Sequence, residues 1–139
     1  MAIYDLAFPI VINAERLVIT DTTGDRGGLS AAGISFVNFP KDPIFEKIKE
    51  LGLKPGQWHD SLTPMAYAFY LKNFWNRIHG NDIAVQEVAN TMFSEALVNG
   101  VKPAIKDMLL GSGATDMEIA EADGEMTAAK VEIINNPRV

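Results

Sequence analysis

The chain has 139 residues and a mass of 15.2 kDa, which is the size of one domain with a substantial core. Hydrophobic residues make up 47% of the chain and charged residues 22%, values that exclude a disordered or collagen-like protein. A net charge of −6 argues against a nucleic-acid partner, and a chain with two histidines and no cysteine cannot form a cysteine-based or histidine-rich metal centre.

The longest apolar run covers only Leu6 to Ile12 and is followed by polar residues. A helix that spans a membrane needs about 20 apolar residues. Neither a positively charged start nor a small-residue cleavage site precedes this run, so it does not have the pattern of a secretory signal. We therefore expect no stable insertion into a membrane.

The first predicted element is a helix between Ile3 and Leu17. Pro9 lies inside it, and because an internal proline divides or kinks a helix, we expect a short turn followed by a helix from about Pro9. The residues expected on its buried face have helical spacing, namely Ile3, Leu6, Ala7, Ile10, Val11, Ala14 and Leu17.

The next segment, Val18 to Ser35, predicts a small β region rich in turns. Its β-branched start is followed by glycines that can take a positive φ, and by Asp21 and Asp25, which can bond nearby amides. The glycines do not fit a phosphate-binding loop, because their spacing is wrong and no lysine follows them.

The remainder of the chain predicts helices separated by glycine and proline. The clearest local signal is Asp42-Pro43 before an apolar stripe that ends at Gly52, because it combines an N-cap, proline at the first helical position and a glycine exit. The other expected helices are Met65 to His79, Asn81 to Asn99, Lys102 to Leu110 and Glu125 to Ile134. The predicted fold class is therefore mainly α, with a small β region between the first two helices.

Candidate chemistry lies around the β region. Glu15 follows the first apolar stripe, Asp25 lies ten residues after Glu15, and Ser30 lies five residues after Asp25. A glutamic acid in apolar surroundings can stay protonated and donate a proton to a leaving oxygen, which glycoside cleavage requires. The structural alternative is that Glu15 is a solvated helix end, Asp25 a turn former and Ser30 a surface hydroxyl.

The stretch from Glu15 to Ser35, ERLVITDTTGDRGGLSAAGIS, resembles the catalytic signature of the glycoside hydrolase family 108 N-acetylmuramidases. That pattern runs Glu-Gly-Gly-Tyr-Val-Asn-Asp-Pro, Asp-x-Gly-Gly, then Thr and Gly-Ile-Thr. The matching positions are Glu15, Asp21, Asp25, Gly27, Gly28, Gly33 and Ile34, with one extra residue before Asp25.

The resemblance extends over nearly the whole chain. YLKNFW at 70–75 is similar to the family's Tyr-x-x-x-Tyr-Trp, and residues 88–100 are similar to its Val-Ala-x-x-x-Phe-Asp-x-x-Val-Asn-x-Gly. Asp123-Gly124 and Thr127 resemble its C-terminal peptidoglycan-binding segment. The resemblance implies a single lysozyme-like domain over 1–139, with a catalytic core over about 1–100 and a peptidoglycan-binding-like segment over about 101–139 packed on it.

The resemblance also implies site residues and an activity. Glu15 corresponds to the general acid of an N-acetylmuramidase that cleaves the β-1,4 bond after N-acetylmuramic acid in peptidoglycan. By analogy with phage-type lysozymes, Asp25 would activate a water or stabilise positive charge on the sugar, and Ser30 would orient the water. Proteins bind sugars by stacking aromatic rings on them and by hydrogen bonds from side-chain amides, so Tyr70, Trp75 and Asn99 are candidate substrate-binding residues. The alternative for the two aromatic residues is a place in the core, where aromatic residues of amphipathic helices more often lie.

The resemblance and the absence of a signal together predict a phage or prophage endolysin or tail lysin. Such a protein would be made in the bacterial cytoplasm and reach the cell wall through a holin or as part of a phage particle. Glycan strands of peptidoglycan are the expected partner, a monomer is favoured over an oligomer, and neither a cofactor nor a metal is implied. The competing hypothesis is an inactive peptidoglycan-binding or phage structural protein, because Arg16, Leu17 and Ser94 replace the family's Gly-Gly and Asp. Ser30 is a further departure from the family pattern, which has Thr at this position.

Overall fold

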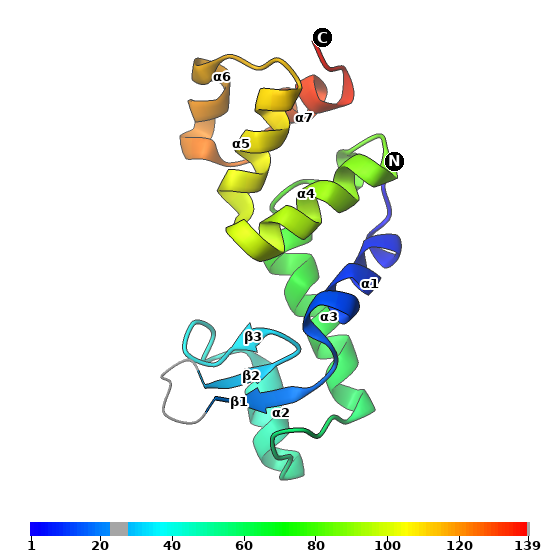
Figure 1. Ribbon diagram of the computed structural model, residues 1–139, viewed down its shortest axis with the longest axis vertical. Coiled ribbons are helices and arrows are strands. Elements are labelled where there is room, and N and C mark those ends of the chain that lie inside the picture. Colours follow the sequence, from blue (N-terminus) through cyan, green and yellow to red (C-terminus); the bar gives the residue numbers. More distant parts are fainter. Residues whose placement is uncertain (23–27, 139) are drawn as a thin grey trace. The chain divides into compact units, whose positions relative to one another are not determined.

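The computed structural model describes residues 1–22 and 28–138, which form helices and one antiparallel sheet (Figure 1). The strands are β1 (Ile19–Asp21), β2 (Leu29–Ala31) and β3 (Ile34–Ser35), and the α-helices are α1 (Tyr4–Glu15), α2 (Pro43–Leu51), α3 (Thr63–Tyr70), α4 (Gln86–Asn99), α5 (Val101–Gly111), α6 (Asp116–Ala120) and α7 (Ala128–Asn135). The predicted fold class, mainly α with a β region between the first two helices, is confirmed. None of the described helices is long and apolar enough to cross a membrane.

The chain divides into two compact units. The first contains Met1–Ile10 and Leu71–Val139, and the second contains Val11–Tyr70, so the division passes through α1 and directly after α3. Residues 101–138 belong to the first unit, where α5 packs against α4. The single domain with a functional boundary near residue 100 stays a prediction.

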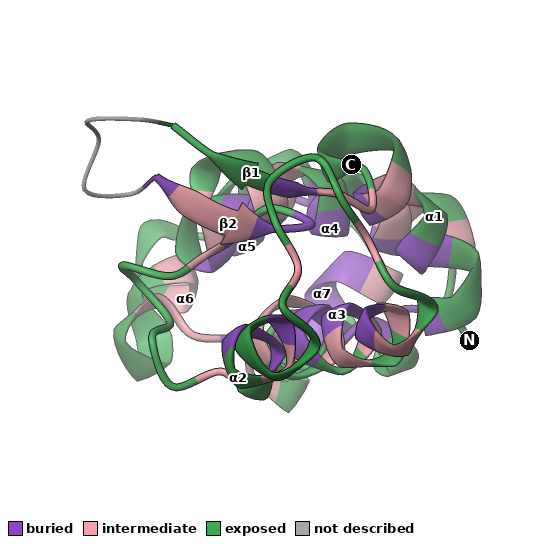
Figure 2. Ribbon diagram, turned by 90° about the horizontal axis from the view of Figure 1, so that it is seen from below, coloured by how far each residue is buried: buried purple, intermediate pink, exposed green. Residues whose placement is uncertain are grey.

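The sheet of the second unit has the order β1-β2-β3. Its register pairs Thr20 with Ser30 and Ser30 with Ser35. Because successive side chains in a strand point to opposite faces, these three hydroxyl residues share one face, and the buried residues Ile19, Ala31 and Ile34 share the other. The ribbons of β1 and β2 accordingly contain both buried and less buried residues (Figure 2). The sheet therefore has one core face and one polar face.

Helix α2 forms as its local signals predict. The side chain of Asp42 accepts a hydrogen bond of 3.0 Å from the backbone N–H of Ile44, and Pro43 occupies the first turn, where its missing N–H costs nothing. Gly52 ends the helix in the left-handed conformation, with a φ of 63°. Its buried side chains are Ile44, Phe45 and Ile48.

Helix α1 differs from its prediction in two respects. It runs without interruption from Tyr4 and contains Pro9, whose exposed ring lies away from the packed side. The predicted buried face is also wrong, because Ile3 and Leu6 are 54% and 59% exposed, whereas the buried residues of the helix are Tyr4, Ala7, Phe8 and Val11. Aromatic packing in the first unit favours this face, since the ring of Tyr4 lies 5.6 Å from that of Trp75.

The helix predicted from Met65 to His79 is not continuous. Helix α3 ends at Tyr70, and Leu71–Trp75 forms a π-helical turn in which the N–H of Asn76 donates to the carbonyl of Leu71 at 2.8 Å. A π turn contains one more residue than an α turn, so it changes which side chains face inward. Trp75 then packs edge-on against Phe93, with ring centroids 5.7 Å apart.

The next predicted helix begins later than expected, at Gln86 rather than at Asn81. Residues 80–82 form a 3₁₀ turn, and Ile83 is extended so that its carbonyl accepts from the N–H of Ala2 at 2.8 Å. The last helix similarly begins at Ala128, after the side chain of Thr127 caps it. The prediction also missed α6, although Thr115 and Glu118 form a capping box that is visible in the sequence.

Candidate active site

Glu15 is the last residue of α1. The N–H of Arg16 still donates to the carbonyl of Ile12 at 2.9 Å, and Arg16 then leaves the helix with a φ of 63°. The expectation of apolar surroundings is wrong, because the side chain of Glu15 is exposed. Its carboxylate is therefore accessible to a substrate from solvent.

The carboxylate of Glu15 lies against the turn that joins β2 to β3. A β-carbon built on Gly33 would lie 2.6 Å from both Cδ and Oε2 of Glu15, which is closer than atoms that are not bonded can approach. Ala32 and Gly33 are the two central residues of the turn, with φ values of 47° and 80°. The structure thus brings the matched Glu15 and Gly33 together.

Tyr70 is hydrogen-bonded to the same turn. Its side chain is 3% exposed, and its hydroxyl donates to the carbonyl of Ala32 at 2.7 Å. Burial raises the pKa of the Tyr70 phenol well above its ordinary value, and the negative charge of Glu15 raises it further. Tyr70 therefore stays protonated and remains a hydrogen-bond donor. Its substrate-binding role stays a prediction.

Ser30 lies at the centre of the polar face of the sheet. Its hydroxyl is 2.6 Å from the hydroxyl of Thr20 on β1, and its side chain is partly exposed. On the other side, Ser35 of β3 accepts from the N–H of Asn38 at 3.4 Å. Asp25 lies outside the described residues. The water-orienting role of Ser30 and the catalytic role of Asp25 stay predictions.

Trp75 is a core residue of the first unit. Its ring is 0% exposed, and its indole N–H donates to the side chain of Asn81 at 2.8 Å. Gly80 lies so close to the ring that a β-carbon there would overlap it. A ring without exposed surface cannot stack on a sugar, so this position does not support the predicted platform.

Asn99, the remaining predicted substrate-binding residue, is exposed at the end of α4. It borders a shallow pocket of about 460 Å³ that is lined by Asn90, Thr91, Ser94, Glu95, Val98 and Asn99. A hydrogen bond with Asp107 raises the pKa of Glu95. Amides, hydroxyls and a carboxyl are groups that can bond sugar hydroxyls, but the binding role of Asn99 stays a prediction.

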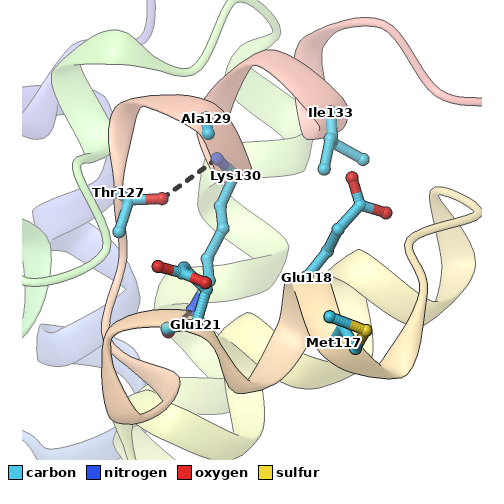
Figure 3. Close-up of a pocket in the computed structure, with 7 residues that line it drawn as sticks. All are labelled: Met117, Glu118, Glu121, Thr127, Ala129, Lys130 and Ile133. Atoms are coloured by element: carbon cyan, nitrogen blue, oxygen red, sulfur yellow. Dashed lines mark hydrogen bonds between the residues drawn. The ribbon is translucent and has the colours of Figure 1, made fainter.

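A second pocket of the first unit, of about 380 Å³, lies between α6 and α7 (Figure 3). Its lining residues are Met117, Glu118, Glu121, Thr127, Ala129, Lys130 and Ile133. Lys130 is 1% exposed, and its ammonium group donates to the carbonyls of Ile119, Glu121 and Glu125 at 3.0, 2.6 and 2.6 Å. These bonds use all three ammonium donors within the protein. Among the described residues, no group of acidic or histidine side chains could hold a metal ion.

The geometry fits the lysozyme-like fold class, because the described residues are mostly helical and the exposed carboxylate of Glu15 lies beside a small antiparallel sheet. Residues 9–100 match the family model described as Glycosyl hydrolase 108, and the chain belongs to this family. At the level of the family it is a glycoside hydrolase.

A solved structure supports the lysozyme-like fold class. The structure of Brucella abortus SagA is similar to this chain with a TM-score of 0.59 and 20% sequence identity, and the similarity covers 94% of this chain and 67% of SagA. No curated protein sequence matches the chain.

Two positions of the site have roles that sequence reasoning missed. Gly33 was matched to the family pattern without a structural role, and Tyr70 was assigned to sugar binding rather than to support of a turn. The signal for the first was present, because a glycine between two short β segments is typical of a two-residue hairpin turn. No local signal indicated that the hydroxyl of Tyr70 would reach residue 32.

Proposed function

We propose that this chain is an N-acetylmuramidase that cleaves the β-1,4 bond between N-acetylmuramic acid and N-acetylglucosamine in peptidoglycan. In this mechanism Glu15 donates a proton to the glycosidic oxygen as the bond breaks. Asp25 then stabilises positive charge on the sugar ring or activates the attacking water, and Ser30 orients that water.

The observation that carries the proposal is the position of Glu15. Its exposed carboxylate lies at the end of α1 against the β2–β3 turn, inside the region that matches the glycoside hydrolase family. A general acid must reach the leaving oxygen of a polymer, and an accessible carboxylate meets that requirement.

We further propose the biological context. The chain would act as a monomeric endolysin or tail lysin of a phage or prophage. It would be made in the bacterial cytoplasm and reach the wall through a holin or as part of a particle. The support for this context is the resemblance of the sequence to the muramidase family, whose family model matches residues 9–100.

Digestion of purified cell walls tests the activity and the bond. Products reduced with borohydride and analysed by mass spectrometry should carry muramitol at the new end. Glucosaminitol would instead indicate a glucosaminidase, and free amino groups would indicate a peptidase. Glu15→Gln should lower wall hydrolysis by orders of magnitude with a melting temperature within a few degrees of the wild type, because an amide cannot donate the proton.

The residues next to Glu15 favour a second candidate function, a peptidoglycan-binding or phage structural protein without catalytic activity. Arg16 and Leu17 stand where the family pattern has two glycines, directly after the proposed acid. A wild-type chain that binds cell walls without releasing muramitol ends would establish the alternative, a binding or phage structural protein.

A further inference from the structure

The β2–β3 turn that contacts Glu15 has a demanding backbone. Ala31 and Ile34 pair at the ends of the two strands, so Ala32 and Gly33 alone make the connection. Both have a positive φ, as the two central residues of a type I′ hairpin turn must. A positive φ is unfavourable for alanine, so other contacts must hold Ala32 in place.

Ala32 is held at both of its backbone polar groups. Its N–H donates to the carbonyl of Val18 at 3.0 Å, and its carbonyl accepts from the buried hydroxyl of Tyr70 at 2.7 Å. Ala32 itself is 0% exposed. The ring of Tyr70 is packed edge-on against that of Phe69 at 5.0 Å, so the donor is fixed as well. The turn therefore has one well-defined position in the second unit.

The side chain of Glu15 lies directly against the backbone of Gly33 in this turn. The nearest atoms to a β-carbon at Gly33 would be Cδ, Oε2 and Cγ of Glu15, at 2.6, 2.6 and 2.7 Å. The carboxylate thus occupies the space that any other residue at this position would fill. The far end of the Glu15 side chain can move aside, so a substitution would displace the carboxylate more readily than it would disrupt the fold.

We propose that Gly33 is a positioning residue for Glu15: its missing side chain sets the place of the carboxylate, and Tyr70 fixes the turn that carries Gly33. This inference rests on the proposed function, in which Glu15 is the general acid. A displacement of about 1 Å can reduce turnover substantially, because proton transfer requires hydrogen-bond geometry.

The test uses three substitutions in the full chain. Gly33→Ala adds a β-carbon at a positive φ. Gly33→Asn adds the same β-carbon, but asparagine tolerates a positive φ better than alanine does. Gly56→Ala is the matched control, because Gly56 has a φ of 89° and no atom within 4 Å of its added β-carbon.

We expect Gly33→Ala and Gly56→Ala to lower the melting temperature by similar amounts, about 3–6 °C, because both place alanine at a positive φ. Only the Gly33 variants should reduce turnover on cell walls, by about tenfold or more at saturating substrate. Gly33→Asn should recover stability relative to Gly33→Ala without recovering turnover.

A readout without catalysis separates this inference from the proposed function. The carboxyl ¹³C resonance of Glu15, assigned by its loss in Glu15→Gln, should move in Gly33→Asn and stay in place in Gly56→Ala. Full turnover and an unmoved resonance in Gly33→Asn would overturn the positioning role. If the resonance moves but Glu15→Gln keeps wild-type turnover, the contact is real and the general-acid role of Glu15, and with it the positioning role, is overturned.

Discussion

The ammonium group of Lys130 donates to the main-chain carbonyl of Glu121 at 2.6 Å, directly before a run of residues with positive φ. The next three residues, Ala122, Asp123 and Gly124, have φ values of 53°, 55° and 82°. A left-handed conformation costs roughly 1–2 kcal/mol for a residue with a β-carbon. The bonds from Lys130 to carbonyls on both sides of these residues offset that cost.

Lys130→Met should therefore destabilise the protein strongly, because methionine keeps the apolar stem and removes all three bonds to carbonyls. Carbonyls left without a donor cost about 1–3 kcal/mol each when they are shielded from water, so we expect a loss on the order of 3 kcal/mol in urea unfolding. Lys102→Met is the control, since the ammonium group of Lys102 reaches the same segment through an exposed ion pair with Asp123 at 3.4 Å, and methionine keeps most of the apolar stem. That variant should change stability by less than about 1 kcal/mol. Equal effects of the two substitutions would contradict the role of Lys130.

The ion pair of Glu118 and Arg138 predicts a dependence of stability on pH. Hydrogen bonds from Arg138, at 2.6 and 2.8 Å, and from the backbone of Thr115 lower the pKa of Glu118 from 4.5 to about 2. A carboxyl whose pKa is lower in the folded state stabilises the fold above its unfolded pKa, and this contribution is lost as the pH falls. We expect the loss between about pH 4.5 and pH 2.

Urea midpoints measured at several pH values across that range check this prediction. Glu118→Gln should flatten the acid limb of the stability curve, because the glutamine has no proton to bind. Arg138→Gln should flatten it partly, since the bond from Thr115 remains. An unchanged acid limb in both variants would show that the pair does not contribute in solution.

Local signals predicted the elements that depend on a few neighbouring residues. Asp42, Pro43 and Gly52 determine both ends of α2, and Gly100 ends α4, because caps act within one turn of the helix. In the site, the position of Glu15 at a helix end was predictable from the end of the apolar stripe that precedes it. Its exposure was not predictable, because exposure depends on packing of the whole second unit.

The remaining features depend on contacts between distant residues. Helix α1 is apolar on more than one side, so its periodicity could not decide between Ile3 and Tyr4 as core residues; the ring of Phe93, 6.0 Å from that of Tyr4, decides it. The turn at Ala32 likewise depends on a hydroxyl 38 positions away in the sequence. Propensity describes neighbours along the chain and does not specify such partners.

Arg16 provides a further test, because it has a φ of 63° where the family pattern has glycine. Arg16→Gly should leave stability unchanged or raise it by up to about 1 kcal/mol, since glycine adopts this conformation without a steric cost but is more flexible when unfolded. If the Arg16 side chain narrows the approach to Glu15, wall hydrolysis should rise in the same variant. A clear loss of stability would show that the arginine side chain makes contacts that outweigh its backbone strain.

Substitutions at Asp25 and Ser30 can distinguish a catalytic role of these residues from a role in stabilising the turn. If Asp25 stabilises charge on the sugar or activates water, Asp25→Asn should reduce turnover by about 10²-fold or more while the fold survives. If Asp25 serves only to bond local amides, Asn makes the same turn and most activity should remain.

Ser30→Ala should cost less than Asp25→Asn, because the water is still present when the hydroxyl is lost. The hydroxyl of Thr20 lies 2.6 Å from that of Ser30, so Thr20→Val should show whether this bond orients Ser30. If it does, Thr20→Val and Ser30→Ala should lower turnover by similar factors, and the double variant should be no worse than either, because both remove one interaction. Ser30→Thr, which restores the family residue, should be neutral or mildly beneficial. Full activity in both Asp25→Asn and Ser30→Ala would leave Glu15 as the only residue with a catalytic role, since the charge and the hydroxyl would each have been removed without effect.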